Sequence, residues 1–190
     1  MNPDRLPEAL PIDENTCLKK LLLKSSAEIF KAIDRDREYL RRWLPFIDNT
    51  RKQEDTENFV KAVLHSNCPK KDLIYEIRTH DEFAGLIALK EIDPWNNKTE
   101  IGYWLVQRFE RHGLITRSCE ALLDLSFNKL GINRVQIKVA VGNARSCLVP
   151  ERLGFSVEGI ERAGEMHQDR YLDLIVYSIL KQDWEQRKDQ

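Results

Sequence analysis

The segment 102–116 constrains the fold more than any other part of the chain. It begins with an apolar run through Val106, typical of a strand, and a basic turn containing Gly113 follows directly. An amphipathic helix is expected next, because apolar residues recur at three- and four-residue spacing up to Leu130, where Gly131 supplies a stop. A turn that leads straight into a helix leaves backbone N–H groups unpaired at the positive end of the helix dipole. The segment therefore predicts an anion site suited to phosphate.

The same pattern also fits an ordinary crossover helix. Glycine turns before helices are common in α/β proteins, and Arg111 and His112 would then be merely solvated. Spacing alone leaves both interpretations open.

Composition narrows the class of protein. A chain of 190 residues suits a single domain spanning 1–190, with a core of about residues 12–181, and 42% hydrophobic with 32% charged residues is typical of a globular protein. The net charge of −1, with both signs interspersed, argues against nucleic acid as a direct partner. Neither a signal peptide nor a membrane-length apolar run is evident, so we expect a cytoplasmic protein without membrane association. The cysteines are scattered and predict reduced thiols and no metal site: Cys17, Cys68, Cys119 and Cys147.

The hydrophobic periods predict an α+β domain with a mixed, mostly antiparallel sheet flanked by helices. Before the central segment, we expect a strand at 17–24, a helix that begins with a capping box at 25–28 and ends at Pro45, and a helix at 54–65. The expected strands are 72–78, 83–92, 99–106, 135–141, 154–160 and 171–180. A short helix, 145–153, would be capped by Asn143, whereas the tails 1–11 and 182–190 are expected to be loosely held.

This order of elements, together with three sequence segments, resembles the GNAT superfamily of acyl-CoA-dependent N-acetyltransferases, most closely its RimJ/RimL-type branch. The similarity covers about residues 17–180. Its carriers are Ile101-Gly102-Tyr103-Trp104-Leu105 with the following turn, Asn143-Ala144-Arg145-Ser146 running to Leu153-Gly154-Phe155, and Glu158-Gly159 leading to Tyr171-Leu172-Asp173. The resemblance implies a GNAT fold and acetyl-CoA as co-substrate, with no metal.

The resemblance also implies a binding site for that co-substrate. The family's pyrophosphate loop places Glu110, Gly113 and Ile115 at its key positions, where Glu110 stands in place of glutamine or arginine. A carboxylate beside a diphosphate weakens binding unless it turns away or finds a cation, which we expect in Arg111 or His112. The implied contacts are Leu105 through its backbone N–H, the loop residues Arg111, His112, Gly113, Leu114, Ile115 and Thr116, and Asn143 and Ser146.

Two side chains are expected to carry the chemistry. Glu165, which would follow the penultimate strand, is implied as the general base, and Ser146 as a contact or proton donor for the thiol. Alternatives for the base are Glu158, Glu161 and His167, and Glu165 could equally be a solvated loop carboxylate. Asp173 is expected to hold a turn or a backbone donor rather than to act as a base. The aromatic side chains of Trp43, Phe46 and Trp95 could line an acceptor groove or simply pack.

The expected activity is therefore direct transfer of an acetyl group from acetyl-CoA to a primary amine in a ternary complex. Family likeness favours a protein N-terminus, possibly of a ribosomal protein, and a homodimer. A small amine such as a polyamine, an antibiotic or an amino acid is the alternative acceptor. A non-catalytic acyl-CoA-binding module and an interaction protein without a ligand remain different classes of function.

Overall fold

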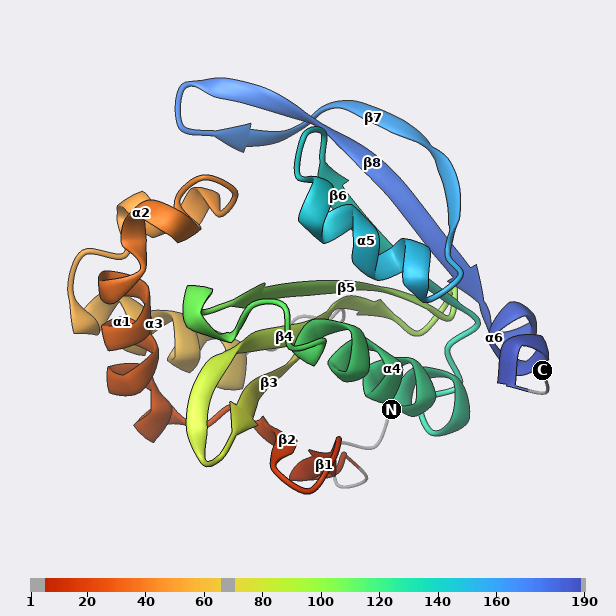
Figure 1. Cartoon of the computed structure of the whole chain (residues 1–190), viewed down its shortest axis with the longest axis horizontal. Coiled ribbons are helices and arrows are strands. Elements are labelled where there is room, and N and C mark those ends of the chain that lie inside the picture. Colours follow the sequence, from red (N-terminus) through yellow and green to blue (C-terminus); the bar gives the residue numbers. More distant parts are fainter. Residues whose placement is uncertain (1–5, 66–70, 189–190) are drawn as a thin grey trace.

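The computed structural model describes residues 6–65 and 71–188, so Cys68 lies outside the described residues. All strands belong to one sheet in the order β1-β2-β3-β4-β5-β6-β8-β7 (Figure 1). Every neighbouring pair is antiparallel except β5 with β6. The strands are β1 (Ala9–Pro11), β2 (Thr16–Lys20), β3 (Lys71–Thr79), β4 (Glu82–Asp93), β5 (Lys98–Leu105), β6 (Arg134–Ala140), β7 (Ser156–His167) and β8 (Arg170–Leu180). This confirms the expected mixed, mostly antiparallel sheet.

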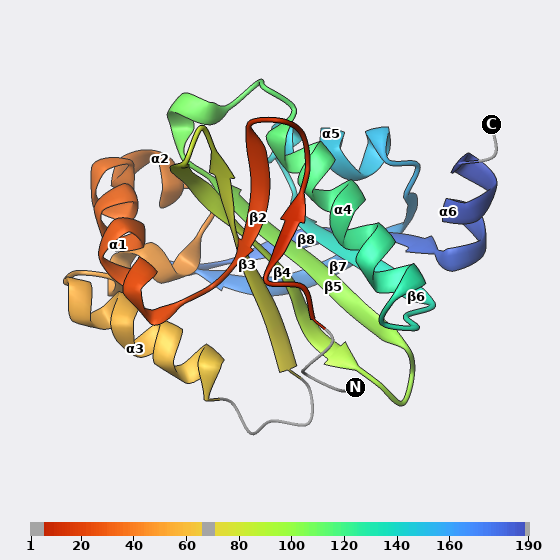
Figure 2. The same ribbon diagram turned by 90° about the horizontal axis from the view of Figure 1, so that it is seen from below.

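Helices cover the sheet on both faces (Figure 2). One face packs against α1 (Ser26–Arg35) and α3 (Gln53–Leu64) through a cluster that includes Ile29, Val60 and Leu86. The opposite face packs against α4 (Leu114–Asn128), α5 (Ala144–Arg152) and α6 (Lys181–Lys188) through a larger cluster. Along β5, alternation sends Gly102 and Trp104 to the first face and Ile101, Tyr103 and Leu105 to the second. We call these the α1 face and the α4 face.

β5 and β6 stay together only briefly. Lys98, Thr99 and Glu100 pair with Arg134, Val135 and Gln136, and beyond them no further pairing joins the two strands in the described chain. β5 nevertheless continues to Leu105 beside β4, and β6 continues to Ala140 beside β8. The sheet therefore opens between them, with strand backbone on each side of the gap that has no strand partner across it.

The N-terminal region departs from the sequence prediction. The end of the tail 1–11, expected to be loosely held, forms β1 and pairs with β2. β2 ends at Lys20, and a 3-10 turn (η2, Leu23–Ser25) replaces the rest of the expected strand 17–24. No capping box forms at Ser25, because its buried hydroxyl donates to Glu76 on β3 instead. The helix expected to reach Pro45 is interrupted at Asp36, giving α1 and the short α2 (Arg37–Leu40) before η3 (Pro45–Asn49). Asp36 accepts from the Gln107 backbone N–H at 2.7 Å, a long-range contact that local pattern could not show.

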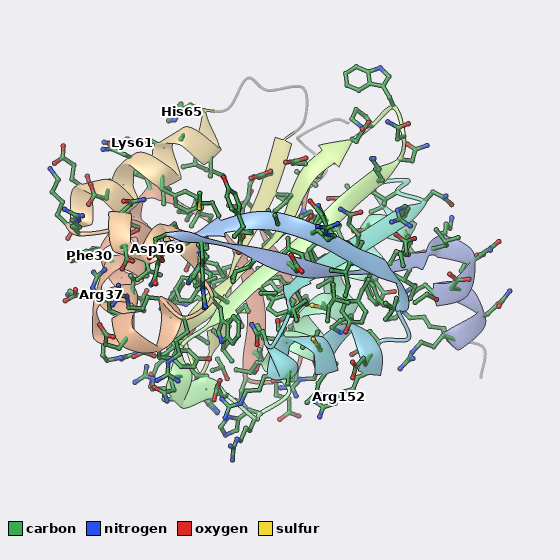
Figure 3. All side chains as sticks on the ribbon, turned by 90° about the horizontal axis from the view of Figure 1, so that it is seen from above. Phe30, Arg37, Lys61, His65, Arg152 and Asp169 are labelled. Carbon is green, nitrogen blue, oxygen red and sulfur yellow. The ribbon has the colours of Figure 1, made fainter. Side chains whose placement is uncertain are left out.

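The hairpin of β7 and β8 is longer than expected. β7 runs to His167, so Glu165 and His167 lie in a strand, where the sequence predicted a loop. A bulge separates the pairs Glu161↔Leu174 and Glu165↔Leu172. The tip of the hairpin, marked by Asp169, lies over the helices that carry Phe30 and Arg37 (Figures 1 and 3). The hairpin thus brings residues near the end of the chain over the N-terminal helices.

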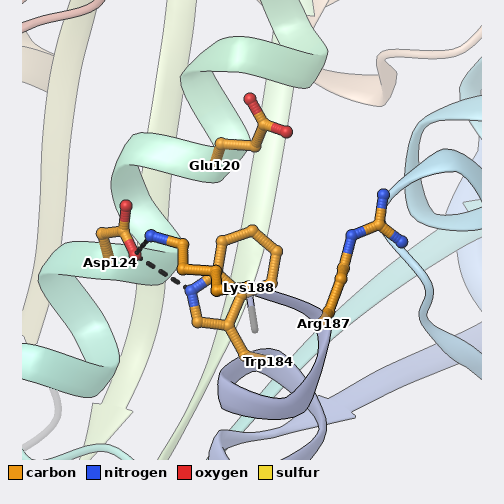
Figure 4. A pocket seen from close by; sticks show the side chains of 5 residues that line it. All are labelled: Glu120, Asp124, Trp184, Arg187 and Lys188. Atoms are coloured by element: carbon orange, nitrogen blue, oxygen red, sulfur yellow. Dashed lines mark hydrogen bonds and ion pairs between the residues drawn. The ribbon is translucent and has the colours of Figure 1, made fainter. Parts of the chain in front are cut away.

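The C-terminal segment is not a loose tail, contrary to expectation. It forms α6, in which Trp184 is only 3% exposed and donates its indole N–H to Asp124 on α4 at 2.9 Å. Lys188 also pairs with Asp124 (Figure 4). Arg187 donates to the Arg152 carbonyl at the end of α5 at 2.6 Å. α6 therefore ties together the other two helices of the α4 face, α4 and α5.

This docking predicts a large stability cost for Trp184→Ala. Removing a buried indole should lower the free energy of unfolding by about 3–5 kcal/mol, measured by equilibrium urea denaturation. The control is Trp95→Ala, whose side chain is 73% exposed, with an expected change within about 0.5 kcal/mol. Equal losses in the two variants would show that α6 contributes little to the folded state.

Candidate active site

The turn before α4 is built as the sequence predicted. Gly113 caps the helix in the left-handed region, at φ +69°, and Arg111 is also left-handed, at φ +66°. No acceptor for the backbone N–H groups of Gly113, Leu114, Ile115 or Thr116 is found in the described residues, and the first helical bond runs from Arg117 N to Gly113 O. His112 and Arg111 are exposed beside these amides. Free amides and a helix N-terminus fit a phosphate group.

Glu110 is paired with a cation that the sequence analysis did not name, Arg145. Its carboxylate accepts from the Tyr39 hydroxyl on α2 at 2.6 Å and pairs with Arg145 on α5. Burial works against ionisation, yet the bonds from Tyr39 and Arg145 hold the pKa of Glu110 below its ordinary value. The charge of Arg111 also lowers this pKa, as expected, but the direct ion-pair partner is Arg145. Glu110 is therefore an ionised carboxylate whose charge is paired with that of Arg145.

Asn143 and Ser146 occupy the first turn of α5. Asn143 caps the helix, as predicted, by accepting from the Ser146 backbone N–H at 3.3 Å. The Ser146 hydroxyl donates to the Tyr103 hydroxyl at 3.1 Å, and Tyr103 in turn donates to the Ser146 carbonyl at 3.1 Å. Burial raises the pKa of Tyr103, so its hydroxyl stays protonated near neutral pH. Two linked hydroxyls thus stand beside the gap on the α4 face.

Tyr103 was missed as a candidate by the sequence analysis. Its signal was present in strand alternation, which sends Ile101, Tyr103 and Leu105 to one face. Leu105, the implied carbonyl-binding position, is the last residue of β5 and is half-buried beside the gap.

Glu165 stands on the α1 face, half-buried, and no hydrogen-bond or ion-pair partner for its carboxylate is found in residues 6–65 and 71–188. Burial raises its pKa, while Lys90 on β4 and His167 oppose the rise and Glu100 on β5 adds to it. A carboxylate in this condition has unoccupied oxygens and a pKa moved toward neutrality. Both are properties of a general base.

The alternative bases differ from Glu165 in this respect. Glu158 accepts from Arg134 and Ser178, which lowers its pKa to about 2, and Glu161 pairs with Lys138 at 2.7 Å. His167 is 2% exposed, and its Nδ1 has no hydrogen-bond partner in the described residues. Glu165 is thus the only one of the three glutamates here without a direct partner among the described residues.

Asp173 holds the bulge in β7. Its Oδ1 accepts from the Ala163 backbone N–H at 2.8 Å, so it anchors a backbone donor as the sequence predicted.

Two of the aromatic candidates for an acceptor groove lie in different places. Trp95 is at the exposed β4–β5 turn. Trp43 lies near Gly142 at the end of β6, and its ring is 3.8 Å from a Cβ placed on Gly142. Trp43 therefore stays a candidate for the acceptor side.

The site has two sides that meet at the opening of the sheet. The free amides, the Ser146 and Tyr103 hydroxyls and α5 lie on the α4 face, and Glu165 with Lys90 and Glu100 lies on the α1 face. A ligand with phosphate at one end could lie along the α4 face and place its other end in the gap. A second reactant could then meet it from the α1 face, beside Glu165.

In the described part of the chain, no group of three or more His, Cys, Asp or Glu side chains is arranged to hold a metal ion. Within the same residues, no helix is both long enough and apolar enough to span a membrane.

Comparison with known proteins agrees with the resemblance to acetyltransferases. The model of the acetyltransferase (GNAT) domain matches residues 16–156. Over 182 residues, the chain is 34% identical to the "Putative ribosomal N-acetyltransferase YdaF" of Bacillus subtilis, covering 93% of this chain and 97% of that protein. It is 27% identical to the ribosomal-protein-serine acetyltransferase of Escherichia coli, covering 91% and 97%. The structure is similar to that of RimL, a ribosomal alpha-N-protein acetyltransferase in complex with coenzyme A, with TM-score 0.86, 25% identity and coverage of 93% and 99%.

The Glu110–Arg145 pair predicts how coenzyme A affinity responds to charge. Arg145→Met leaves a carboxylate unneutralised beside the phosphate amides, so we expect the Kd for coenzyme A to rise roughly threefold to tenfold by calorimetry. The double variant with Glu110→Gln removes that carboxylate and should restore most of the affinity. A double variant as weak as Arg145→Met would instead mean that Arg145 itself contacts the ligand.

Proposed function

Because this chain belongs to the acetyltransferase (GNAT) family, we propose that it transfers an acetyl group from acetyl-CoA to the N-terminal amine of a protein, with a ribosomal protein as the favoured acceptor. The observation that carries the choice of acceptor is the similarity to ribosomal-protein acetyltransferases along nearly the whole chain. Similarity of that extent includes the α1 face and the β7–β8 hairpin, where the acceptor would bind.

The α4 face would hold acetyl-CoA. The amides of Gly113 to Thr116 would bind the diphosphate, and the positive end of α4 adds a favourable field. Unpaired strand backbone along β5 and β6 offers donors and acceptors to an amide-containing arm placed in the gap, much as an added strand would use them. Acetyl-CoA supplies the activated acyl group, and a backbone N–H near Leu105 would polarise its carbonyl.

The hydroxyl pair would serve the leaving thiol. Ser146 donates to Tyr103 in the free protein, and rotation of the Ser146 hydroxyl would point its hydrogen toward a sulfur atom in the gap. Tyr103 keeps its own proton and holds the Ser146 carbonyl, which fixes the first turn of α5. We therefore assign Ser146 the thiol contact and Tyr103 its orientation.

Glu165 would act as the general base from the α1 face. An amine nucleophile must lose a proton on its way to an amide, and the unpartnered carboxylate of Glu165 can accept it directly or through a water molecule. The tetrahedral intermediate would form in the gap, between the base and the hydroxyl pair. Direct transfer needs no acyl-enzyme.

Three further expectations belong to this proposal. The whole chain would act as one catalytic domain with a core of about residues 12–181, in the cytoplasm, as a homodimer. Fractionation of cells and light scattering of the purified protein check the last two.

The acceptor is tested by a panel of peptides with different N-terminal residues, alongside polyamines and amino acids, with acetyl-CoA as donor. We expect a mass increase of one acetyl group on peptide N-termini and little on the small amines. Turnover on polyamines alone would replace the protein acceptor by a small one. Coenzyme A binding without turnover on any amine would indicate a binding module.

The role of Glu165 is tested by Glu165→Gln, which keeps the size of the side chain and removes the base. We expect kcat on the best peptide to fall by about 10²–10⁴-fold, with an unchanged Kd for coenzyme A. In the wild type, activity is lost as the pH falls through the raised pKa of Glu165, because only the ionised carboxylate accepts a proton. A matched control is Glu161→Gln, which we expect to retain most activity. Full activity of Glu165→Gln near neutral pH would move the base elsewhere.

A further inference from the structure

Lys90 lies across a neighbouring strand at a position that has no side chain. Its ammonium pairs with Glu100 on β5 at 2.7 Å, and its stem passes over Gly102. A Cβ built on Gly102 would be only 2.8 Å from Lys90 Cδ, and 3.8 Å and 3.9 Å from Cγ and Cε. Gly102 does not have a positive φ, so its backbone does not require glycine. The missing side chain makes room for Lys90.

This arrangement fixes a cation on the α1 face near the opening of the sheet. Glu100 is the last β5 residue paired with β6, and it also accepts from Gln136 on β6 at 3.3 Å. Glu100 is therefore held by two strands and in turn holds Lys90. The Lys90 side chain is 47% exposed, so it is not enclosed in the core.

The charged groups around Glu165 come from three strands. Lys90 on β4 and His167 on β7 favour its ionised form, and Glu100 on β5 disfavours it. Beyond these, Asp72 on β3 acts on Lys90 and Asp48 on η3 faces His167, while the β8 neighbour of Glu165 is Leu172. In the described residues nothing donates a hydrogen bond to Glu165, so only charge opposes the cost of its burial, which still raises its pKa.

We propose that Lys90, laid over Gly102 and held by Glu100, is a positioning residue that keeps Glu165 ionised and ready to take the acceptor's proton. The inference rests on the proposed function, in which Glu165 is the base. A direct Lys90–Glu165 ion pair would occupy the carboxylate oxygens and weaken the base. Because the direct partner of Lys90 is Glu100, the cation acts on Glu165 through space and leaves its oxygens free.

The first test measures Glu165 itself, without any turnover. Carbon-detected NMR follows the titration of the Glu165 side chain, assigned by its absence in Glu165→Gln, in the wild type and in Lys90→Met. We expect the Glu165 midpoint to move to higher pH in Lys90→Met and to stay in place in Lys90→Arg. The matched control is Lys138→Met, which removes a lysine on the adjacent strand β6 whose partner is Glu161. An unchanged midpoint in Lys90→Met overturns the proposal.

The second test follows kcat against pH on the best acceptor. In Lys90→Met we expect the acid limb to move to higher pH, so that the rate at about pH 6 falls roughly threefold or more while the plateau at high pH is retained. Lys90→Arg and Lys138→Met should keep the wild-type limb. A uniform loss at every pH, with no movement of the limb, contradicts a role through Glu165.

The third test asks whether Gly102 acts through Lys90. Gly102→Ala should displace the flexible stem of Lys90 and move the acid limb in the same direction as Lys90→Met. In the Lys90→Ala background, the same substitution should have no further effect on the limb. An effect of Gly102→Ala that persists undiminished without Lys90 overturns the assignment of Gly102.

Acetyl transfer and the role of Lys90 are tested by separate measurements. If no amine is acetylated, the proposed function is lost, yet the NMR midpoints still report on Lys90 and Glu165. If Glu165→Gln is inactive and Lys90→Met matches the wild type in both midpoint and limb, Glu165 remains the base and the role of Lys90 is refuted.

Discussion

The separation of β5 from β6 is the constraint on which the rest of the structure depends. Three residue pairs hold the strands together, and each strand then follows its outer neighbour, which leaves backbone polar groups without a strand across the gap. Such groups are costly inside a folded protein unless water or a ligand satisfies them. The opening is tolerated because the larger cluster, on the α4 face, contains residues of β3, β4 and β5 as well as of β6 and β8, so both halves of the sheet pack into one core. In the proposed site, binding would therefore rely first on main-chain groups, with side chains adding to them.

Glu110 shows how a residue that looks unfavourable in the sequence is accommodated. A carboxylate next to a phosphate loop would lower affinity by charge repulsion if it were free. In the structure the Glu110 carboxylate accepts from Tyr39 on α2 and pairs with Arg145 on α5. It thus joins α2, the turn before α4, and α5. The carboxylate thereby becomes a link between α2 and α5.

The hydrophobic period and the turn residues of the sequence predicted most of the sheet and the helices α3, α4 and α5. They also predicted the Asn143 cap and the backbone bond of Asp173. Each of these features depends on residues that are near neighbours in the chain. The failures share a different cause. Ser25 donates to a distant strand, Asp36 binds the backbone of Gln107, and α6 is held by its docking on α4 and α5. Likewise, the placement of Lys90 over Gly102 and the partner of Glu110 arise from contacts between segments far apart in the chain. No local pattern encodes such contacts.

The bulge in β7 has a consequence beyond the site. β7 is the terminal strand of the sheet, and an uninterrupted outer strand offers a row of N–H and C=O groups on which a foreign chain can polymerise. Here Ala163 turns to φ +51° and gives its N–H inward to Asp173, which breaks that row in the middle of the strand. The β7 bulge next to Glu165 therefore also disfavours fibril-like pairing of this strand with another chain.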